Sequence, residues 1–362
     1  MAFINPTNGD VSLEVKAPHW RSITHEMLSA RIETSHGPED FYEANIKGCG
    51  YLKPSAKGEY SLDEYDNWHR TNEYDSLGAY GLADVSEFSN NHGDIIDHTR
   101  NLIEHGLRTE MYGAWGKLKN VYYKGSKVPV QELRDQEVIP RSTHLVPAIG
   151  LRFLKTNTRV AEFTDHDDAI AQEILKRAFE TFNREMKDKE LDIPVISLEN
   201  PSTHSVFFKT FFERMGTNLA VLNNLGYCDW HLHSSNVTMA SEIADIGVMF
   251  DAKSVKEQED SKPIAHGVRV GYIKDMRDTA YTLATMLRKA EKLGIVIGDR
   301  NELFEACIHR FNETLADKDI KKTQKALADD HRKMFEYIMR KSIVEDAPLP
   351  SIKKVDPSTW TL

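Results

Sequence analysis

Residues 229–255, DWHLHSSNVTMASEIADIGVMFDAKSV, contain an asparagine and an aspartate nine positions apart, Asn236 and Asp245. Apolar and polar residues alternate between them, the apolar ones being Val237, Met239 and Ile243 and the polar ones Thr238, Ser241 and Glu242. This alternation predicts a short, half-buried β-hairpin. Because a hairpin brings its two ends together, we expect Asn236 and Asp245 to lie at one edge of it.

An amide oxygen and a carboxylate oxygen at this spacing suit a magnesium ion that is bound to a nucleotide. Mg²⁺ prefers hard oxygen ligands in octahedral geometry, keeps several waters and takes further ligands from phosphates. In protein kinases the Asn of the H-R-D-L-x-x-x-N loop and the Asp of the D-F-G triplet hold the metal in this way. Here DWHLHSSN occupies the place of the loop, and Asp245-Ile246-Gly247 that of the triplet. The alternative is a chance pairing of two common turn residues.

Length and charge restrict the class of protein. A chain of 362 residues exceeds the roughly 250–300 residues at which a single core stops growing, so we expect two lobes. The formal net charge of −10 argues against nucleic acid or an anionic membrane surface as a partner. The three cysteines have no C-x-x-C spacing, and no stretch approaches the roughly 18 apolar residues of a membrane span. We therefore expect a cytoplasmic protein that is neither membrane-bound nor exported.

Periodicity divides the chain into a mixed α/β N-lobe, residues 1–165, and a helical C-lobe, residues 166–362. The N-lobe pattern predicts strands at 119–124 and 147–154, and a helix from Asp94 that ends at Gly106. Helices of the C-lobe are expected at 167–186, 205–226, 276–294 and 318–342. The predicted fold class is α+β, with the nucleotide-binding residues in the N-lobe and a catalytic and metal loop at 229–251 in the C-lobe.

Two of these helices have an apolar face that predicts core residues. In helix 167–186 they are Ile170, Ile174, Leu175, Ala178 and Phe182. In helix 205–226 they are Phe208, Phe211, Phe212, Met215, Leu219 and Leu222.

A lysine at the end of an expected strand is a candidate phosphate ligand. Lys47 directly precedes Gly48, and Gly50 follows shortly after. Such a lysine can bind the α- and β-phosphates when an acidic residue on the next helix holds it in place, and Asp94 and Asp97 are the candidates for that role. Taken alone, K-G-x-G is most often an ordinary strand-to-turn exit, and the sequence has no G-x-G-x-x-G here.

Two arginines seven residues apart, Arg152 and Arg159, flank an expected strand and turn. The planar guanidinium group matches phosphate oxygens, so two that converge from one loop can bind a pyrophosphate or a leaving phosphate. The alternative is a pair of solvated surface arginines.

Together these motifs resemble the selenoprotein O family, also called the YdiU family. The shared order is Lys47-Gly-x-Gly, the helix end His105-Gly106-Leu107-Arg108-Thr109, Arg152-x6-Arg159 with Glu162-Phe163, and Asn236-x8-Asp245-x-Gly, over about residues 44–255. That family has a kinase-like fold in which ATP binds in a flipped orientation and AMP is transferred to protein hydroxyls. The resemblance implies that Lys47, Arg152 and Arg159 bind phosphates, that Asn236 and Asp245 hold Mg²⁺, and that Asp251 matches a further family aspartate.

The chain departs from this pattern at the general base. The kinase loop Asp falls at His231, and the family Asp that precedes the metal Asn falls at Ser235. A hydroxyl acceptor loses a proton during transfer, so His231, His233 or Asp229 is expected to take it. Alternatively, the acceptor is a carboxylate, which needs no base and gives an acyl-adenylate for ligation. The C-terminal Cys-x-x-Cys pair that the family often carries is also absent.

Three other interpretations remain open. The H-x-H of His231 and His233 is found in metal-dependent hydrolases with a (β/α)₈ barrel, where it binds zinc. A kinase that transfers the γ-phosphoryl group to a small molecule has a similar loop. A non-catalytic pseudokinase scaffold would explain the missing aspartate. We expect ATP and Mg²⁺ as cofactors and an unidentified protein or small molecule as the acceptor.

Overall fold

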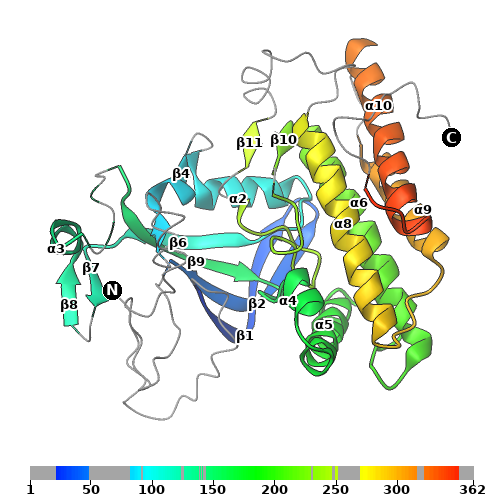
Figure 1. The fold of residues 1–362 in the computed structure, drawn as a ribbon, viewed down its shortest axis with the longest axis horizontal. Helices are drawn as coiled ribbons and strands as arrows, with labels where there is room; N and C mark the ends of the chain where they lie inside the picture. The colour runs from blue at the N-terminus through cyan, green and yellow to red at the C-terminus, as the bar shows by residue number, and fades with distance from the viewer. Residues whose placement is uncertain are drawn as a thin grey trace. The chain divides into compact units, whose positions relative to one another are not determined.

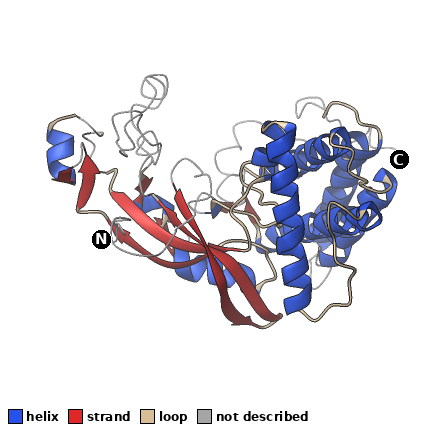
Figure 2. Ribbon diagram, turned by 90° about the horizontal axis from the view of Figure 1, so that it is seen from below, coloured by secondary structure: helices blue, strands red, loops and turns tan. Residues whose placement is uncertain are grey.

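The computed structural model describes residues 22–48, 82–90, 93–123, 126–137, 139, 141, 144–229, 231–246, 249–251, 270–315 and 322–349. It divides into two compact units. Unit 1 consists of Met1–Glu33, Gly37–Asn101 and Glu110–Asn157, and unit 2 of Thr34–His36, Leu102–Thr109 and Thr158–Leu362. Strands are concentrated in unit 1 and helices in unit 2 (Figure 2). The predicted mixture of helices and strands is therefore confirmed.

Unit 1 is built on a five-stranded sheet (Figure 1). Its strands are β1 (Ser22–Thr34), β2 (Gly37–Lys47), β3 (Ala83–Asp84), β6 (Met111–Lys117) and β9 (Pro147–Leu154). Strand β9 pairs antiparallel with β2, β3 and β6, and it has the range that the sequence predicts. Strand β9 has strands on both sides, which satisfy its backbone, and its side chains are buried or half-buried throughout.

One face of this sheet is covered by aromatic side chains. Phe88 stacks on Trp115, with ring centroids 5.8 Å apart, and meets Tyr112 edge to face. A Cβ at Gly150 would lie 2.4 Å from a ring carbon of Phe88, so only glycine leaves room for this ring above β9. Short elements lead into this layer: the 3₁₀ helix η3 (Val85–Glu87), strands β4 (Ser89–Asn90) and β5 (Gly93–Asp94), and helix α2 (Ile95–Glu104).

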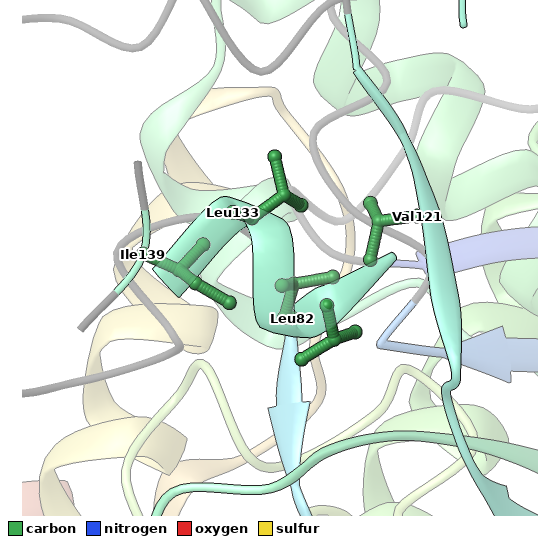
Figure 3. Close-up of a cluster of buried hydrophobic side chains, with 5 residues drawn as sticks. Leu82, Val121, Leu133 and Ile139 are labelled. Carbon is green, nitrogen blue, oxygen red and sulfur yellow. The ribbon is translucent and has the colours of Figure 1, made fainter. Parts of the chain in front are cut away.

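A small hydrophobic cluster holds a further part of unit 1. It includes strand β7 (Asn120–Tyr123), strand β8 (Ser126–Pro129) and helix α3 (Val130–Asp135). The buried side chains of the cluster are Leu82, Val121, Val130, Leu133 and Ile139. Figure 3 labels Leu82, Val121, Leu133 and Ile139, which gather at α3 from separate segments of the chain. Strand β7 confirms the strand that the sequence predicts at 119–124.

Unit 2 is mainly helical (Figure 1). Its elements are α4 (Val160–Asp165), α5 (Asp168–Asp188), η4 (Pro201–Thr203), α6 (His204–Leu225), β10 (Tyr227–Cys228), β11 (Phe250–Asp251), α8 (Val270–Lys292), α9 (Arg300–Thr314), α10 (Lys322–Met339) and the π-helical turn η6 (Arg340–Val344). Capping residues set several ends. The side chains of Asp167 and Asp299 accept backbone N–H groups at the starts of α5 and α9, and Gly226 ends α6 in the left-handed conformation. No described helix is long and apolar enough to cross a membrane.

The predicted core face is confirmed for α6 and is partly wrong for α5. All six predicted side chains of α6 are buried. In α5, Ile170 is 45% exposed, whereas Phe179 and the carboxylate-bearing Glu185 are buried. The buried face of α5 is therefore rotated relative to the prediction. A polar residue in that face carries no hydrophobic signal, so periodicity does not reveal it.

The close approach of α6 and α9 gives a test of this packing. A Cβ added at Gly216 would lie 2.2 Å from the carbonyl oxygen of Cys307. Gly→Ala in an ordinary helix interior stabilises by about 0.5–1 kcal/mol. Here we expect Gly216→Ala to destabilise unit 2 by about 1–3 kcal/mol, because the backbones must move apart. Urea unfolding followed by circular dichroism measures the change. Lys209→Ala, at an exposed position of the same helix, is the control; equal or greater stability of Gly216→Ala would contradict the packing.

Candidate functional site

In unit 1 the candidate phosphate ligand Lys47 is held by a carboxylate. Its Nζ lies 2.9 Å from Oε2 of Glu87, and Lys47 is only 5% exposed. The other oxygen of Glu87 accepts the backbone N–H of Asp84 at 3.1 Å, as part of a capping box that starts η3. The capping box thus fixes the carboxylate that orients Lys47.

The sequence analysis expected Asp94 or Asp97 as this acidic partner, and the structure gives Glu87 instead. Asp94 accepts hydrogen bonds from the backbone of Ile96 and from Trp115 Nε1, both at 2.9 Å, and Asp97 is exposed on α2. The D-x-x-E spacing of Asp84 and Glu87 is a capping-box pattern, and it is the signal that could have pointed to Glu87.

Gly48 has a conformational reason to follow Lys47. Its φ is +83°, and a Cβ there would lie 2.5 Å from the carbonyl oxygen of Ala148. Glycine therefore lets the chain leave the sheet beside β9. Gly50, the other glycine of the predicted motif, lies outside the described residues.

Arg152 belongs to the same face of the sheet as Lys47. In the antiparallel register Lys47 lies opposite Gly150 and Asn45 opposite Arg152, and residues two apart on a strand share a face. The guanidinium donates Nε to Asn45 Oδ1 at 2.6 Å and Nη1 to Glu110 Oε2 at 2.5 Å. Arg152 is 3% exposed and Glu110 is fully buried, so the alternative of a solvated surface arginine is wrong for Arg152. Unit 1 thus carries two cations on one face, each beside a carboxylate.

In unit 2 the segment from Asn236 to Asp245, called here the 236–245 loop, folds back on itself. Val237 and Ile243 form a single antiparallel bridge, and Ala244 N–H donates to the carbonyl oxygen of Asn236 at 2.9 Å. The two ends therefore meet, as predicted. The rest of the hairpin prediction is wrong, because the segment is a tight turn with one bridge and the polar residues expected at its surface, Thr238, Ser241 and Glu242, are buried.

Arg159 lies beside this loop. It is the N-cap residue of α4 and pairs with Thr238 in an antiparallel bridge, while Val160 N–H donates to the carbonyl oxygen of Val237 at 2.9 Å. Its side chain is fully buried, so the surface alternative is wrong here too. Unit 2 thus brings together Arg159, Asn236 and Asp245.

The metal chemistry open to this loop is that of oxygen ligands. Asn236 and Asp245 are both half-buried and offer one amide oxygen and one carboxylate. Within the described ranges, no group of three His, Cys, Asp or Glu side chains is arranged to hold a metal ion. A zinc site in unit 2 on His231 and His233 would need a third such ligand. The antiparallel sheet of unit 1 is also unlike the parallel barrel that this interpretation requires.

The candidate bases occupy two environments. The rings of His231 and His233 lie edge to face with centroids 6.1 Å apart, close to the ion pair that Lys274 Nζ and Asp278 Oδ2 form at 2.5 Å on α8. Asp229 is fully buried after β10, and its backbone N–H donates to Asp275 Oδ2 at 2.8 Å. The histidines are the more accessible bases. Asp251, the further family position, is the last residue of β11.

Partial burial lowers the pKa of His231 below its ordinary value, Lys274 lowers it further, and Asp278 opposes both. Burial is also the main cause of the lowered pKa of His233; Asp278 and Asp245 oppose it, whereas His231 and Lys274 add to it. The lowered pKa favours the neutral form of both imidazoles, the form that accepts a proton. Lys274 and Asp278 were not identified from the sequence, because an i,i+4 ion pair resembles any solvated helix face.

Comparison with known proteins adds no family assignment: no protein-family model matches the chain, and no curated protein matches its sequence.

The two histidines give a testable pH dependence. In metal-free buffer we expect both imidazoles to titrate below about pH 6.5, the ordinary midpoint. The unfolded chain then binds protons at a higher pH than the folded one, so this contribution to stability is present above about pH 6.5 and is lost as the pH falls through the folded pKa. NMR titration measures the midpoints. Asp278→Asn should lower them further and Lys274→Gln should raise them; midpoints at or above 6.5 would contradict the assignment.

Proposed function

We propose that this chain is a divergent relative of the selenoprotein O family, with a bilobal kinase-like fold, and that it binds Mg²⁺ and ATP and transfers AMP to an acceptor. The observation that carries the proposal is the Lys47–Glu87 ion pair at the end of an antiparallel strand. A lysine held by a glutamate is the arrangement by which kinase-like sites bind the α- and β-phosphates. The resemblance implies such an acidic partner for Lys47, and Glu87 is proposed for that role.

The proposed metal site supports the same reading. Mg²⁺ bound to nucleotide phosphates needs few protein ligands, and the 236–245 loop holds Asn236 and Asp245 at one end of a turn. Arg159, whose backbone is bridged to this loop, would stabilise the charge that develops on the phosphates. The roles of Arg159 and of Arg152 in AMP transfer rest on the resemblance to the family.

In the proposed reaction an acceptor oxygen attacks the α-phosphorus, and the bond from that phosphorus to the bridging oxygen of the pyrophosphate breaks. Mg²⁺, which Asn236 and Asp245 would hold, would neutralise the charge on the departing pyrophosphate. If the acceptor is a hydroxyl, its proton passes to the neutral imidazole of His231 or His233. If the acceptor is a carboxylate, no base is needed and the product is an acyl-adenylate.

The first experiment identifies the group that is transferred. The purified protein is incubated with Mg²⁺ and with ATP labelled at the α- or the γ-phosphate, alone and with a cell extract. We expect α-label in an adduct and release of pyrophosphate. Transfer of the γ-label with release of ADP would instead show a kinase, and ATP binding without turnover in any fraction would favour a pseudokinase.

The metal assignment is tested by Asp245→Asn. Asp245 has φ +61°, a conformation that asparagine tolerates, so this change removes the charge with little backbone strain. We expect Mg²⁺-dependent nucleotide turnover to fall roughly 100-fold or more, because loss of a charge next to a divalent cation costs several kcal/mol. Asp192→Asn, at an exposed position of unit 2, is the matched control. Unchanged metal dependence in Asp245→Asn would refute the assignment.

The lysine assignment is tested by Glu87→Gln. The amide cannot hold the ammonium of Lys47 by charge, so we expect ATP affinity to fall by about tenfold, a loss of ~1.4 kcal/mol. Isothermal calorimetry with a non-hydrolysable ATP analogue measures it. Asp97→Asn, which changes the exposed carboxylate that the sequence favoured, should leave the affinity unchanged. A larger effect of Asp97→Asn than of Glu87→Gln would reverse the assignment.

A further inference from the structure

The 236–245 loop is fastened from outside by the segment Arg108–Thr109. Arg108 donates its Nε to the carbonyl oxygen of Ala240 at 2.7 Å, and its own carbonyl accepts Ile243 N–H at 2.9 Å. The hydroxyl of Thr109 donates to the carbonyl oxygen of Ile243 at 2.6 Å. Two adjacent residues thus make three hydrogen bonds to one side of the loop.

Helix α6 adds a second support through Asn218, which is 1% exposed. Its Oδ1 accepts the backbone N–H of Arg108 at 3.0 Å, and its Nδ2 donates to the carbonyl oxygen of Ser241 at 2.9 Å. A single amide side chain therefore joins the fastening segment to the loop.

The direction of the Arg108 side chain is set by Glu185 of α5. Both terminal nitrogens of Arg108 donate to the two oxygens of this carboxylate at 2.6 Å, which leaves Nε directed at Ala240. Glu185 is 1% exposed and also lies 3.0 Å from Nη2 of Arg214. A bidentate pair of this kind fixes the plane of the guanidinium as well as its position.

The loop has conformations that need such support. Ser241 and Asp245 both have φ +61°, in the left-handed region that residues with a Cβ adopt when their surroundings impose it. Ser241 accepts from Asn218 through its carbonyl oxygen, and Asp245 follows Ala244, whose N–H closes the loop onto Asn236. The bonds from Arg108, Thr109 and Asn218 fall on Ala240, Ser241 and Ile243, at or near these two positions, and so support both conformations.

We propose that the Arg108–Glu185 pair is a positioning device for the 236–245 loop: it holds Asn236 and Asp245 in the arrangement that binds Mg²⁺ without touching the metal. The metal role of the loop rests on the function proposed above, whereas the fastening of the loop does not. Glu185 of α5 thus influences the Mg²⁺ affinity of the loop through Arg108.

The test uses the full chain with Glu185→Gln and two measurements. The first is the Mg²⁺ concentration that gives half-maximal binding of a non-hydrolysable ATP analogue. The second is hydrogen–deuterium exchange of the peptide that contains residues 236–245, without ligand, compared with α9. We expect half-saturation to need about tenfold more Mg²⁺, and exchange to rise in the loop but not in α9. Glu185→Asp, which keeps the charge, should recover part of both effects.

Glu173→Gln is the matched control, because it removes an exposed carboxylate of the same helix, paired with Arg177 at 2.9 Å. If Glu185→Gln does not fold, Arg108→Lys replaces it: lysine keeps the charge, but its single nitrogen cannot reproduce both the bidentate pair with Glu185 and the separate Nε bond to the carbonyl of Ala240. Exchange and half-saturation that match those of the control would overturn the proposal, and so would exchange that rises equally throughout unit 2.

The same design separates this inference from the proposed function. If the wild-type protein shows no Mg²⁺-dependent nucleotide binding, the function is refuted and the exchange measurement alone decides whether the pair fastens the loop. If the wild-type protein binds Mg²⁺ and nucleotide but Glu185→Gln leaves loop exchange and half-saturation unchanged, the positioning role is refuted and the function stands.

Discussion

Opposite charges that are buried together hold the segments on which the candidate site depends. A buried ion is strongly destabilising when its partner is removed, typically by 3–5 kcal/mol, so each pair ties two segments of the chain to each other. In unit 1, Lys47 is tied to η3 through Glu87, and Arg152 to the start of β6 through Glu110. In unit 2, Glu185 ties α5 to Arg108. Lys47 and Arg152 in unit 1 are candidates for function, and Arg108 in unit 2 supports the 236–245 loop. All three therefore also help to hold the fold together.

The buried polar residues of unit 1 form a hydrogen-bonded network. Arg152 in β9 donates to Asn45, which is fully buried and in turn donates to Thr24 at 2.9 Å. A buried network of this kind is stabilising only when its members are satisfied, and it then specifies one register of the strands. A shift of β2 against β9 by one residue would turn Lys47 and Asn45 to the other face of the sheet. The network thus fixes which face carries the proposed phosphate ligands.

Apolar periodicity and the position of a glycine predicted several elements of the fold correctly. The range of β9 and the buried face of α6 follow from runs of apolar residues, and α2 ends before a glycine as expected. The alternation of apolar and polar residues likewise predicted that the ends of the 236–245 loop meet. The burial of the loop's polar residues could not be predicted. Thr238 bonds to Glu242 and Ser241 to Ala240 within the loop, but the contacts that fasten the loop come from distant segments: the hydrogen bond from Thr109 to Ile243 spans 134 positions.

The same limit applies to the charge pairs. The sequence offered Asp94 and Asp97 for Lys47 because they begin a helix, and the sheet geometry gives Glu87, which the analysis had not considered. Glu185 lies in the apolar stripe of α5, where hydrophobic periodicity gives no reason to expect a carboxylate. In both cases tertiary contacts determine the partner. From the sequence alone, the residues around Glu87 predict only a capping box and those around Glu185 only a helix.

The residues at the base positions bear on the acceptor in the proposed reaction. An aspartate next to a metal-bound triphosphate is an anion, whereas burial and Lys274 lower the pKa values of His231 and His233 and so favour neutral imidazoles. A neutral base adds no negative charge next to the phosphates, so an acceptor that is itself an anion can approach more readily than it could near a carboxylate. A neutral imidazole does not repel an ionised acceptor, and it can also take the proton of a hydroxyl acceptor, becoming a cation when it does so. Under the proposed function, the replacement of aspartate by His231 and Ser235 therefore permits a carboxylate acceptor while it keeps a base for a hydroxyl.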